Sequence, residues 1–500
     1  MNSPARASAR PRSVRLSAHL IALIAALAIT VAPRVAQAHA HLVKSAPAAN
    51  SHVSGSPTEL RLWFSEAAEV TMTTISVTGP NGERVAIGPI DVDGTDPLVM
   101  YTALAAPIGA GTYTVRWRTV ATDDGHPSSG KFSFVVDAAT NGAPTRADAA
   151  ASISPGHLVP EAAPAPTIAP HAGAVSAMDV ESPSYVIARW LNFMALITVI
   201  GIVAFRFLVV PRVVSRLNAD SAVPESSTAA AFVIDTARRG ASVGLTASIV
   251  VVIAAVWRLY AERAVIGGGI EIRTVLHSYW GLVWHVQLGA ALLACVAFSL
   301  ARHSVPSKAA TSGWALAAIA AIILGASSAF AGHAMAAPEY RTTAVALDIL
   351  HVLAAGGWLG GLFALATVGV PVALAAGTDS DRPAGMPFVA RVVNAFSPVA
   401  LSLAGVVVVT GGLAAKMRIG SWAALLDSNY GKVLMIKLGF VLLVVAGGAF
   451  NWRRMRIALS LPTGYSAVST FRRSAWFEIT AGILVIAATA VLVATQPPIH

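Results

Sequence analysis

Two patterns of hydrophobic and polar positions divide this chain. Between about residues 40 and 137, apolar and polar residues alternate in short runs such as "ELRLWF" (59–64) and "TYTVRWRTV" (112–120). Turn-forming stretches such as "GPNGE" (79–83) separate these runs. Short alternating strands at this spacing predict a small antiparallel β-sandwich of the Greek-key, immunoglobulin-like type.

From about residue 181 onward the pattern changes to long apolar runs. A helix needs roughly 20 residues to cross the hydrocarbon of a bilayer, and several runs reach that length. These runs lie near 185–209, 240–260, 279–301, 313–333, 343–370, 392–415, 431–450 and 475–495. The sequence therefore predicts an all-α, polytopic membrane bundle of about eight transmembrane helices.

The remaining segments have compositions of their own. Residues 1–38 begin with several arginines, continue with "LIALIAALAITVA" and end in small residues, which is typical of a secretory signal peptide. Cleavage before His39 fits the small-x-small rule, but cleavage before His41 fits it too, so both registers stay open. Residues 138–180 are rich in Ala and Pro and predict an unfolded linker between the sandwich (39–137) and the bundle (181–500).

Composition and charge agree with a membrane protein. Hydrophobic residues make up 55% of the chain and charged residues only 12%. If the sandwich lies outside the membrane, the loops predicted inside hold roughly twice as many Lys and Arg as those predicted outside. The net charge of +10 then serves topology, and we expect lipid rather than nucleic acid as the partner. This orientation puts the sandwich on the extracytoplasmic side of the membrane.

Candidate metal ligands occur in the sandwich. Asp124 and His126 lie two residues apart in "ATDDGHPSSG", where a tight turn would bring carboxylate and imidazole together, although Asp-Gly is also an ordinary turn sequence. If cleavage exposes His39, its α-amine and ring form a chelate, because an α-amine has a pKa of about 8 and loses its proton readily. A nitrogen and oxygen set without thiolate favours Cu(II), and Zn(II), which suits it less well, stays open as the alternative. The one cysteine, Cys295, excludes an internal disulfide.

A rival copper site overlaps the first. The tripeptide His39-Ala40-His41 would hold Cu(II) through the amine, two deprotonated backbone amides and the ring of His41. A first β-strand would use those amides for hydrogen bonds, so we expect His41 to be a strand residue.

The bundle carries ionisable residues that are costly in lipid, by roughly 2.5–3.5 kcal/mol for a charge at the helix centre, and that point to function. His285, His333 and His351 are expected within a similar distance of the outer surface. Asp348 shares a helical face with His351, and Met335 offers a thioether suited to Cu(I). We favour a copper pathway around His333, Asp348 and His351, and an interhelical hydrogen bond for His285 taken alone.

Other residues of the bundle have simpler interpretations. Met194 supplies a second thioether at comparable depth. Lys437 and Glu478 are expected to extend toward the membrane surfaces, without a functional role. The Gly-Gly steps at 356–357, 360–361, 411–412 and 447–448 are typical of close helix packing.

The sandwich resembles a known family. The stretches "HAHLVKSAPAANSHV", "LRLWFSEAAE" and "YTVRWRTVATDDGHPSSGKFSFVV" are similar to the CopC family of periplasmic copper-binding proteins. The resemblance implies Cu(II) ligands at His39, Asp124 and His126. The methionine-rich loop that some members use for Cu(I) is missing, since only Met72 and Met100 lie in this domain.

The bundle resembles the CopD family of copper-resistance membrane proteins, through "GHA" (332–334), "LDILHVLAAGGWLGGL" (347–362), "NYGKVLMIKLG" (429–439) and "FEITAGILVIAATAVL" (477–492). Fused chains of this layout resemble copper-acquisition proteins, which implies copper import, with other periplasmic copper carriers as partners. The ligands themselves do not determine whether copper is imported or exported. The chain shows no nucleotide-binding loop, and no enzyme activity is expected.

Two other classes of function remain open. In the first, His285 and His351 or a neighbouring pair hold a b-type haem, and the protein passes electrons to copper. In the second, the protein is a copper sensor or storage protein and the bundle is only its anchor.

Overall fold

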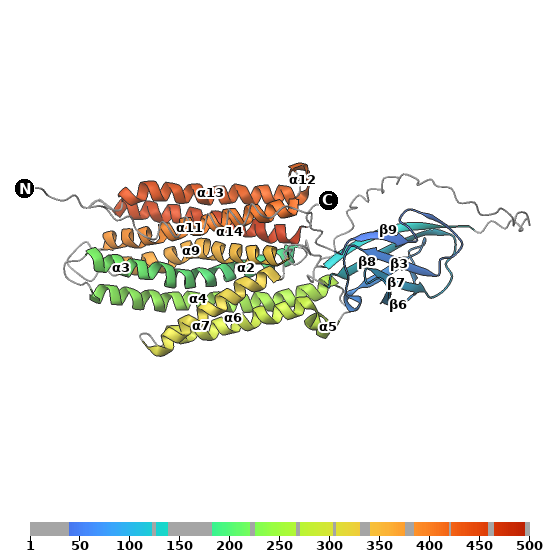
Figure 1. Cartoon of the computed structure of the whole chain (residues 1–500), viewed down its shortest axis with the longest axis horizontal. Helices are drawn as coiled ribbons and strands as arrows, with labels where there is room; N and C mark the ends of the chain where they lie inside the picture. Colours follow the sequence, from blue (N-terminus) through green and yellow to red (C-terminus); the bar gives the residue numbers. More distant parts are fainter. Residues whose placement is uncertain are drawn as a thin grey trace, which may run out of the picture.

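The computed structural model describes residues 40–122, 127–138, 183–220, 226–266, 271–303, 307–330, 341–375, 385–419, 422–458 and 465–495. Figure 1 shows two parts along the long axis of the molecule, a β-sandwich at one end and a bundle of long helices beside it. Both predicted fold classes are therefore confirmed.

The sandwich has two sheets that enclose one apolar core. The first sheet has the order β1-β3-β7-β6 and the second the order β2-β9-β8-β4-β5. Alternation along the strands places Leu60, Val115 and Phe134 fully inside. Pairing is antiparallel as expected, except that β2 runs parallel to β9. The elements are β1 (Leu42–Ala46), β2 (His52–Ser54), β3 (Glu59–Phe64), the 3₁₀ turn η1 (Val70–Met72), β4 (Thr74–Thr78), β5 (Arg84–Val85), β6 (Ile87–Val92), β7 (Val99–Leu104), β8 (Gly111–Val120) and β9 (Pro127–Asp137).

The described part of the bundle contains 8 helices long and apolar enough to cross a membrane, which confirms the predicted number. The first span is α2 (Pro183–Ala204), η2 (Phe205–Val209) and α3 (Val210–Asp220), and the next three are α4 (Ser226–Ile266), α6 (Tyr279–His303) and α7 (Lys308–Phe330). The fifth span is α8 (Arg341–Ala355), η3 (Gly356–Gly360), α9 (Gly361–Ala364), η4 (Leu365–Gly369) and α10 (Val370–Ala375). The last three are α11 (Gly385–Ile419), α13 (Asn429–Ala458) and α14 (Tyr465–Ala494), and the short helices α5 (Ile272–His277) and α12 (Trp422–Asp427) precede α6 and α13.

The fifth span packs directly against the first. Its segments η3 and η4 have π-helical geometry, which often occurs at functional sites in helices. A Cβ added at Gly201 would overlap the backbone of Gly360, and one added at Gly360 would overlap the Ile197 carbonyl. The two helices therefore touch backbone to backbone, as small residues permit in membrane proteins.

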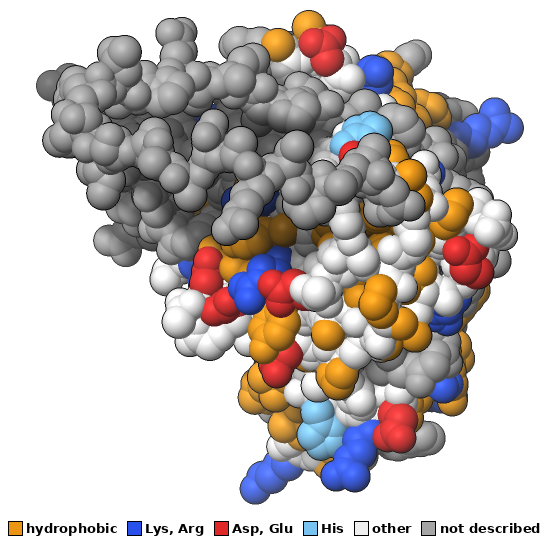
Figure 2. Space-filling model, turned by 90° about the vertical axis from the view of Figure 1, so that its right-hand side faces the viewer, with side chains coloured by type: hydrophobic (Ala, Val, Ile, Leu, Met, Phe, Trp, Pro, Cys, Tyr) orange, Lys and Arg blue, Asp and Glu red, His pale blue; other side chains and the backbone are white. Residues whose placement is uncertain are grey.

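One end of the sandwich contacts the bundle around α5, which lies at the junction in Figure 1. Met72 and Val120 of the sandwich form one buried apolar cluster with Val275, Trp280 and Trp284. We call these residues the docking cluster. In the view onto the sandwich end of the molecule, acidic and basic side chains are interspersed among apolar ones on the described surface (Figure 2), so this face is no extended basic patch.

Candidate functional site

Five of the predicted ligands, His39, Asp124, His126, His333 and Met335, lie outside the described residues. Among the residues that the structure does describe, no group of three or more His, Cys, Asp or Glu side chains could hold a metal. The described residues that bear on the predicted sites are the neighbours of the sandwich ligands and the remaining candidates of the bundle.

The chain segments that flank the sandwich ligands meet at one end of the sandwich. The His41 amide donates to the Ser65 hydroxyl at 3.0 Å, and the Ser65 amide donates to the His41 carbonyl at 2.9 Å. Two residues further on, the Ala67 carbonyl accepts a hydrogen bond of 3.0 Å from the Thr122 amide. The segment 65–67 thus holds His41 beside Thr122, which lies two residues after the end of β8 and four residues before His126.

The backbone of His41 is occupied in this arrangement. Its amide hydrogen is one of the two that the rival tripeptide site would have to release to a metal, and the hydrogen bond to Ser65 competes with that release. Burial also lowers the pKa of the His41 imidazole. His41 itself lies directly before β1, so the expectation of a strand residue is off by one position.

The same end of the sandwich carries the docking cluster. Val120 pairs with Pro127 at the base of the loop that contains Asp124 and His126, and Val120 is also a member of the cluster. Beside it, the carboxylate of Glu69 accepts a hydrogen bond from the backbone N–H of Tyr279, the first residue of α6. Burial raises the pKa of Glu69, and this hydrogen bond opposes the rise. A carboxylate at a helix N-terminus also interacts favourably with the helix dipole.

Inside the bundle, the ring of His351 has a defined orientation. Its Nδ1 lies 2.9 Å from the Thr410 hydroxyl oxygen, and that hydroxyl donates to the Val406 carbonyl at 2.7 Å. With the hydroxyl proton directed at that carbonyl, the hydroxyl oxygen accepts a hydrogen bond from Nδ1 of His351. A second partner that fixes the tautomer in this way is typical of metal-binding histidines. Gly411 lines the ring, since a Cβ there would lie 3.1 Å from Cε1 of His351.

The other two described candidates differ in position. Asp348 lies one turn before His351 on α8 and is half-buried. His285 lies on α6, on a face that also exposes Leu282 and Val286. Its Nδ1 donates to the Gly281 carbonyl at 2.7 Å, within its own helix. The structure therefore brings Asp348 and His351 onto one helix but leaves His285 on the outer side of the bundle.

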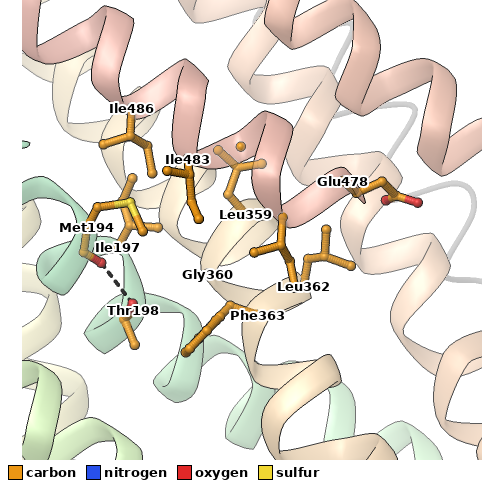
Figure 3. A pocket seen from close by; sticks show the side chains of 12 residues that line it. Met194, Ile197, Thr198, Leu359, Gly360, Leu362, Phe363, Glu478, Ile483 and Ile486 are labelled. Carbon is orange, nitrogen blue, oxygen red and sulfur yellow. Dashed lines mark hydrogen bonds between the residues drawn. The ribbon is translucent and has the colours of Figure 1, made fainter. Parts of the chain in front are cut away.

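A small cavity of about 30 Å³ lies between α2, the fifth span and α14. That volume is enough for one or two water molecules. Its lining is apolar except for Met194, Thr198 and Glu478, and Met194 and Glu478 stand at opposite ends (Figure 3). The Thr198 hydroxyl donates to the Met194 carbonyl at 2.8 Å.

The structure corrects the interpretation of Glu478. This side chain is only 5% exposed, so it does not extend to the membrane surface. It lies against α13, where Cβ atoms added at Gly447 and Gly448 would lie 2.8 Å from its Cγ and 3.8 Å from its Oε2. The sequence did contain a signal for this burial, because Glu478 is the single acidic residue of the last apolar run. Thr410 gave no comparable signal, because threonine is ordinary in an apolar helix.

Comparisons with known proteins agree with both parts of the chain. Family models match as "CopC domain" over residues 42–137, as "Copper resistance protein D-like, N-terminal domain" over 178–340 and as "Copper resistance protein D" over 390–492. A β-sandwich fused to a bundle of this kind defines a copper-resistance membrane protein of two family domains. The chain belongs to the CopC–CopD copper-resistance family.

Individual relatives cover different parts of the chain. The copper transport protein CutJ of Bacillus subtilis is 26% identical over 441 residues, 86% of this chain and 70% of that protein. Copper resistance protein C of Pseudomonas syringae pv. tomato is 37% identical over 109 residues, 20% of this chain and 83% of that protein. The crystal structure of CopC from Methylosinus trichosporium OB3b has 29% identity, covers 21% of this chain and 98% of that one, and gives a TM-score of 0.20.

Proposed function

We propose that this protein captures Cu(II) on the extracytoplasmic side of a bacterial plasma membrane and imports copper through its helical bundle. His39 as the mature N-terminus, Asp124 and His126 are the proposed Cu(II) ligands of the sandwich. His351 is the proposed first ligand of the bundle, supported by Asp348 and joined by His333 and Met335. The name of the relative CutJ, a copper transport protein, supports transport over storage.

The observation that carries the proposal is the docking of the sandwich. The end at which the flanking segments of the proposed ligands meet, around Ser65, Thr122 and Pro127, is the end whose Val120 packs on Trp280 and Trp284. An anchor would need no such contact. A metal released from this end would leave the sandwich next to the bundle rather than at the far end of a linker.

The arrangement inside the bundle supports a route for copper. The Thr410 hydroxyl orients the ring of His351, and nine residues further along the same span lies Gly360, which lines the cavity. A thioether from Met194 stands at one end of that cavity and a carboxylate from Glu478 at the other. Thioether sulfur suits Cu(I), and a buried carboxylate lowers the cost of a cation in a low-dielectric interior.

The test is uptake of radioactive copper by proteoliposomes that contain the full-length protein. We expect His351→Ala to lower the initial uptake rate at least tenfold. His285→Ala is the matched control, because His285 lies on the outer side of α6, and it should leave the rate within twofold of the wild type. Equal rates for the wild type and both variants would contradict the proposed route. Faster loss of copper from preloaded vesicles, without uptake, would mean that the protein exports copper.

A further inference from the structure

A cluster of charged and polar side chains is buried near the docking cluster, between α2, α4 and α6. Arg189 of α2, Arg258 and Glu262 of α4 and Gln287 of α6 are each at most 9% exposed. The guanidinium of Arg258 lies over the ring of Trp280, 5.9 Å from its centroid, and Trp280 belongs to the docking cluster. The copper route proposed above uses other residues.

Only part of the hydrogen-bonding capacity of this cluster is used. The Tyr185 hydroxyl donates to Oε2 of Glu262 at 2.6 Å, and Nη1 of Arg258 donates to Oε1 of Gln287 at 3.1 Å. Arg189 stacks on Tyr185, with its guanidinium carbon 4.6 Å from the ring centroid.

Several buried donors have no acceptor among the described residues. They are Nη1 of Arg189, Nε of Arg258 and the amide nitrogen of Asn192. Asn192 lies one turn after Arg189 on α2 and is fully buried, so its amide cannot reach bulk solvent. Buried donors are nearly always paired, with protein, with water or with a ligand, so three of them together require an explanation.

The charges of the cluster do not balance either. Arg189 and Arg258 repel each other electrostatically, and both act on Tyr185. Glu262 is the one carboxylate among the described residues of the cluster, and it accepts a hydrogen bond from the Tyr185 hydroxyl. Two guanidinium groups and one carboxylate leave an excess positive charge in a buried environment, which is costly unless an anion neutralises it.

We propose that the cluster binds a small monovalent inorganic anion such as chloride. Each of its side chains is at least nine-tenths buried, which favours an ion over a lipid headgroup. Of the four unpaired atoms of these side chains, three are donors on cationic or amide nitrogens, which suits an anion and repels a copper ion, and one, the amide oxygen of Asn192, is an acceptor. The inference goes beyond the proposed function: it assigns the α2, α4 and α6 side of the bundle to an anion and leaves the route past His351 to copper.

The test uses the copper-free, full-length protein in detergent. Its thermal unfolding is measured while chloride replaces gluconate at constant ionic strength. We expect a saturable rise of Tm with chloride, because a ligand that binds only the folded state stabilises it by mass action. Arg189→Gln should abolish this rise, and Arg61→Gln, on the surface of the sandwich, should retain it. Bromide should replace chloride and give an anomalous X-ray signal in the cluster.

A second variant guards against a folding failure of Arg189→Gln. Asn192→Asp places a fixed negative charge beside Arg189, so its Tm should no longer depend on chloride and should match or exceed that of the wild type in gluconate. A wild-type Tm that is the same in chloride and gluconate overturns the proposal and leaves water as the occupant. An unchanged chloride response in Asn192→Asp also overturns it. Because no copper is present, either result is distinct from a failure of copper transport.

Discussion

The imidazole Nδ1 of His351 donates a hydrogen bond of 2.9 Å to the hydroxyl of Thr410, which joins the fifth span to the sixth. Thr410 is fully buried and its own proton goes to the Val406 carbonyl, so the direction of the bond is fixed. A histidine held in this way keeps one tautomer and one ring orientation. The same bond makes the geometry of His351 sensitive to its neighbours on α11.

The glycine beside Thr410 offers a test of that geometry. In Gly411→Ala the new Cβ would lie 3.1 Å from Cε1 of His351, closer than most side-chain contacts. The ring has to shift by a few tenths of an ångström, and we expect the rate of copper uptake to fall severalfold because ligand placement is disturbed. Proteoliposome uptake measures the effect.

The neighbouring glycine supplies the control. A Cβ at Gly412 has no heavy atom within 4 Å, so Gly412→Ala should leave uptake unchanged and should stabilise the helix slightly. An equal loss of uptake in both variants would mean that the helix, and not the ring of His351, sets the rate.

Copper binding by the sandwich distinguishes its two candidate sites. Because the His41 amide is bonded to Ser65, we expect His41→Ala to change the Cu(II) affinity of the full-length protein less than threefold. Asp124→Ala or His126→Ala should each weaken Cu(II) binding at least a hundredfold, since each removes a proposed ligand. Competition with a chromophoric chelator gives the affinities. The reverse ranking would move the site to the tripeptide His39-Ala40-His41.

Much of the fold follows from local patterns in the sequence. A period of two marks the strands, and apolar length marks the spans, because each reflects burial along one element. Helix ends are harder to predict. The helix α4 begins at Ser226, well before the apolar run near 240–260, because Asp235, Arg238 and Arg239 interrupt the hydrophobic pattern. The parallel pairing of β2 with β9 has no local signal at all, because it depends on a contact between residues 83 positions apart in the sequence.

Contacts between distant elements account for the rest. Met72 and Trp280 are each ordinary apolar residues in their own segments, and only the folded chain brings them into one cluster. Thr410 lies 59 residues from His351. The charges of Arg189 and Arg258 are buried, although they lie in apolar runs that hydropathy alone assigns to lipid. Local pattern therefore predicts which residues are buried, but not which of them meet.

Docking of the sandwich should depend on pH through Glu69. Burial against the bundle raises the pKa of this carboxyl above its ordinary value of 4.5, so the charged form is disfavoured in the docked state. A carboxyl whose pKa is higher in the docked state than in the undocked state stabilises docking in its protonated form. This contribution is complete at a pH below the ordinary pKa, and it is lost as the pH rises through the raised pKa of the docked state. We therefore expect docking to weaken as the pH rises above about 4.5 toward neutrality.

Energy transfer between a dye on the sandwich and a dye on the bundle measures this docking, in a protein whose Cys295 is replaced by serine. In Glu69→Gln the side chain still accepts the Tyr279 N–H but has no proton to lose, so the pH dependence between about 4 and 7 should disappear. An unchanged pH dependence in this variant would assign it to another group.

The side chain of Glu478 is buried against a pair of glycines, Gly447 and Gly448. In Gly447→Ala the new Cβ would lie 2.8 Å from Cγ of Glu478 in a packed interface, and such overpacking costs about 1–3 kcal/mol of stability. In Gly448→Ala the Cβ would be at an ordinary 3.8 Å from Oε2, and stability should hold. Thermal unfolding of the two variants gives the comparison.

The charge of Glu478 is tested separately from its packing. Glu478→Gln keeps the shape of the side chain, so the Tm should stay within a few degrees of the wild type or rise, since a buried charge is costly. If the carboxylate offsets the charge of a passing copper ion at the inner end of the cavity, this variant should slow uptake severalfold. Uptake at the wild-type rate in Glu478→Gln, together with an altered Tm, would limit Glu478 to helix packing and would remove the cavity from the copper route.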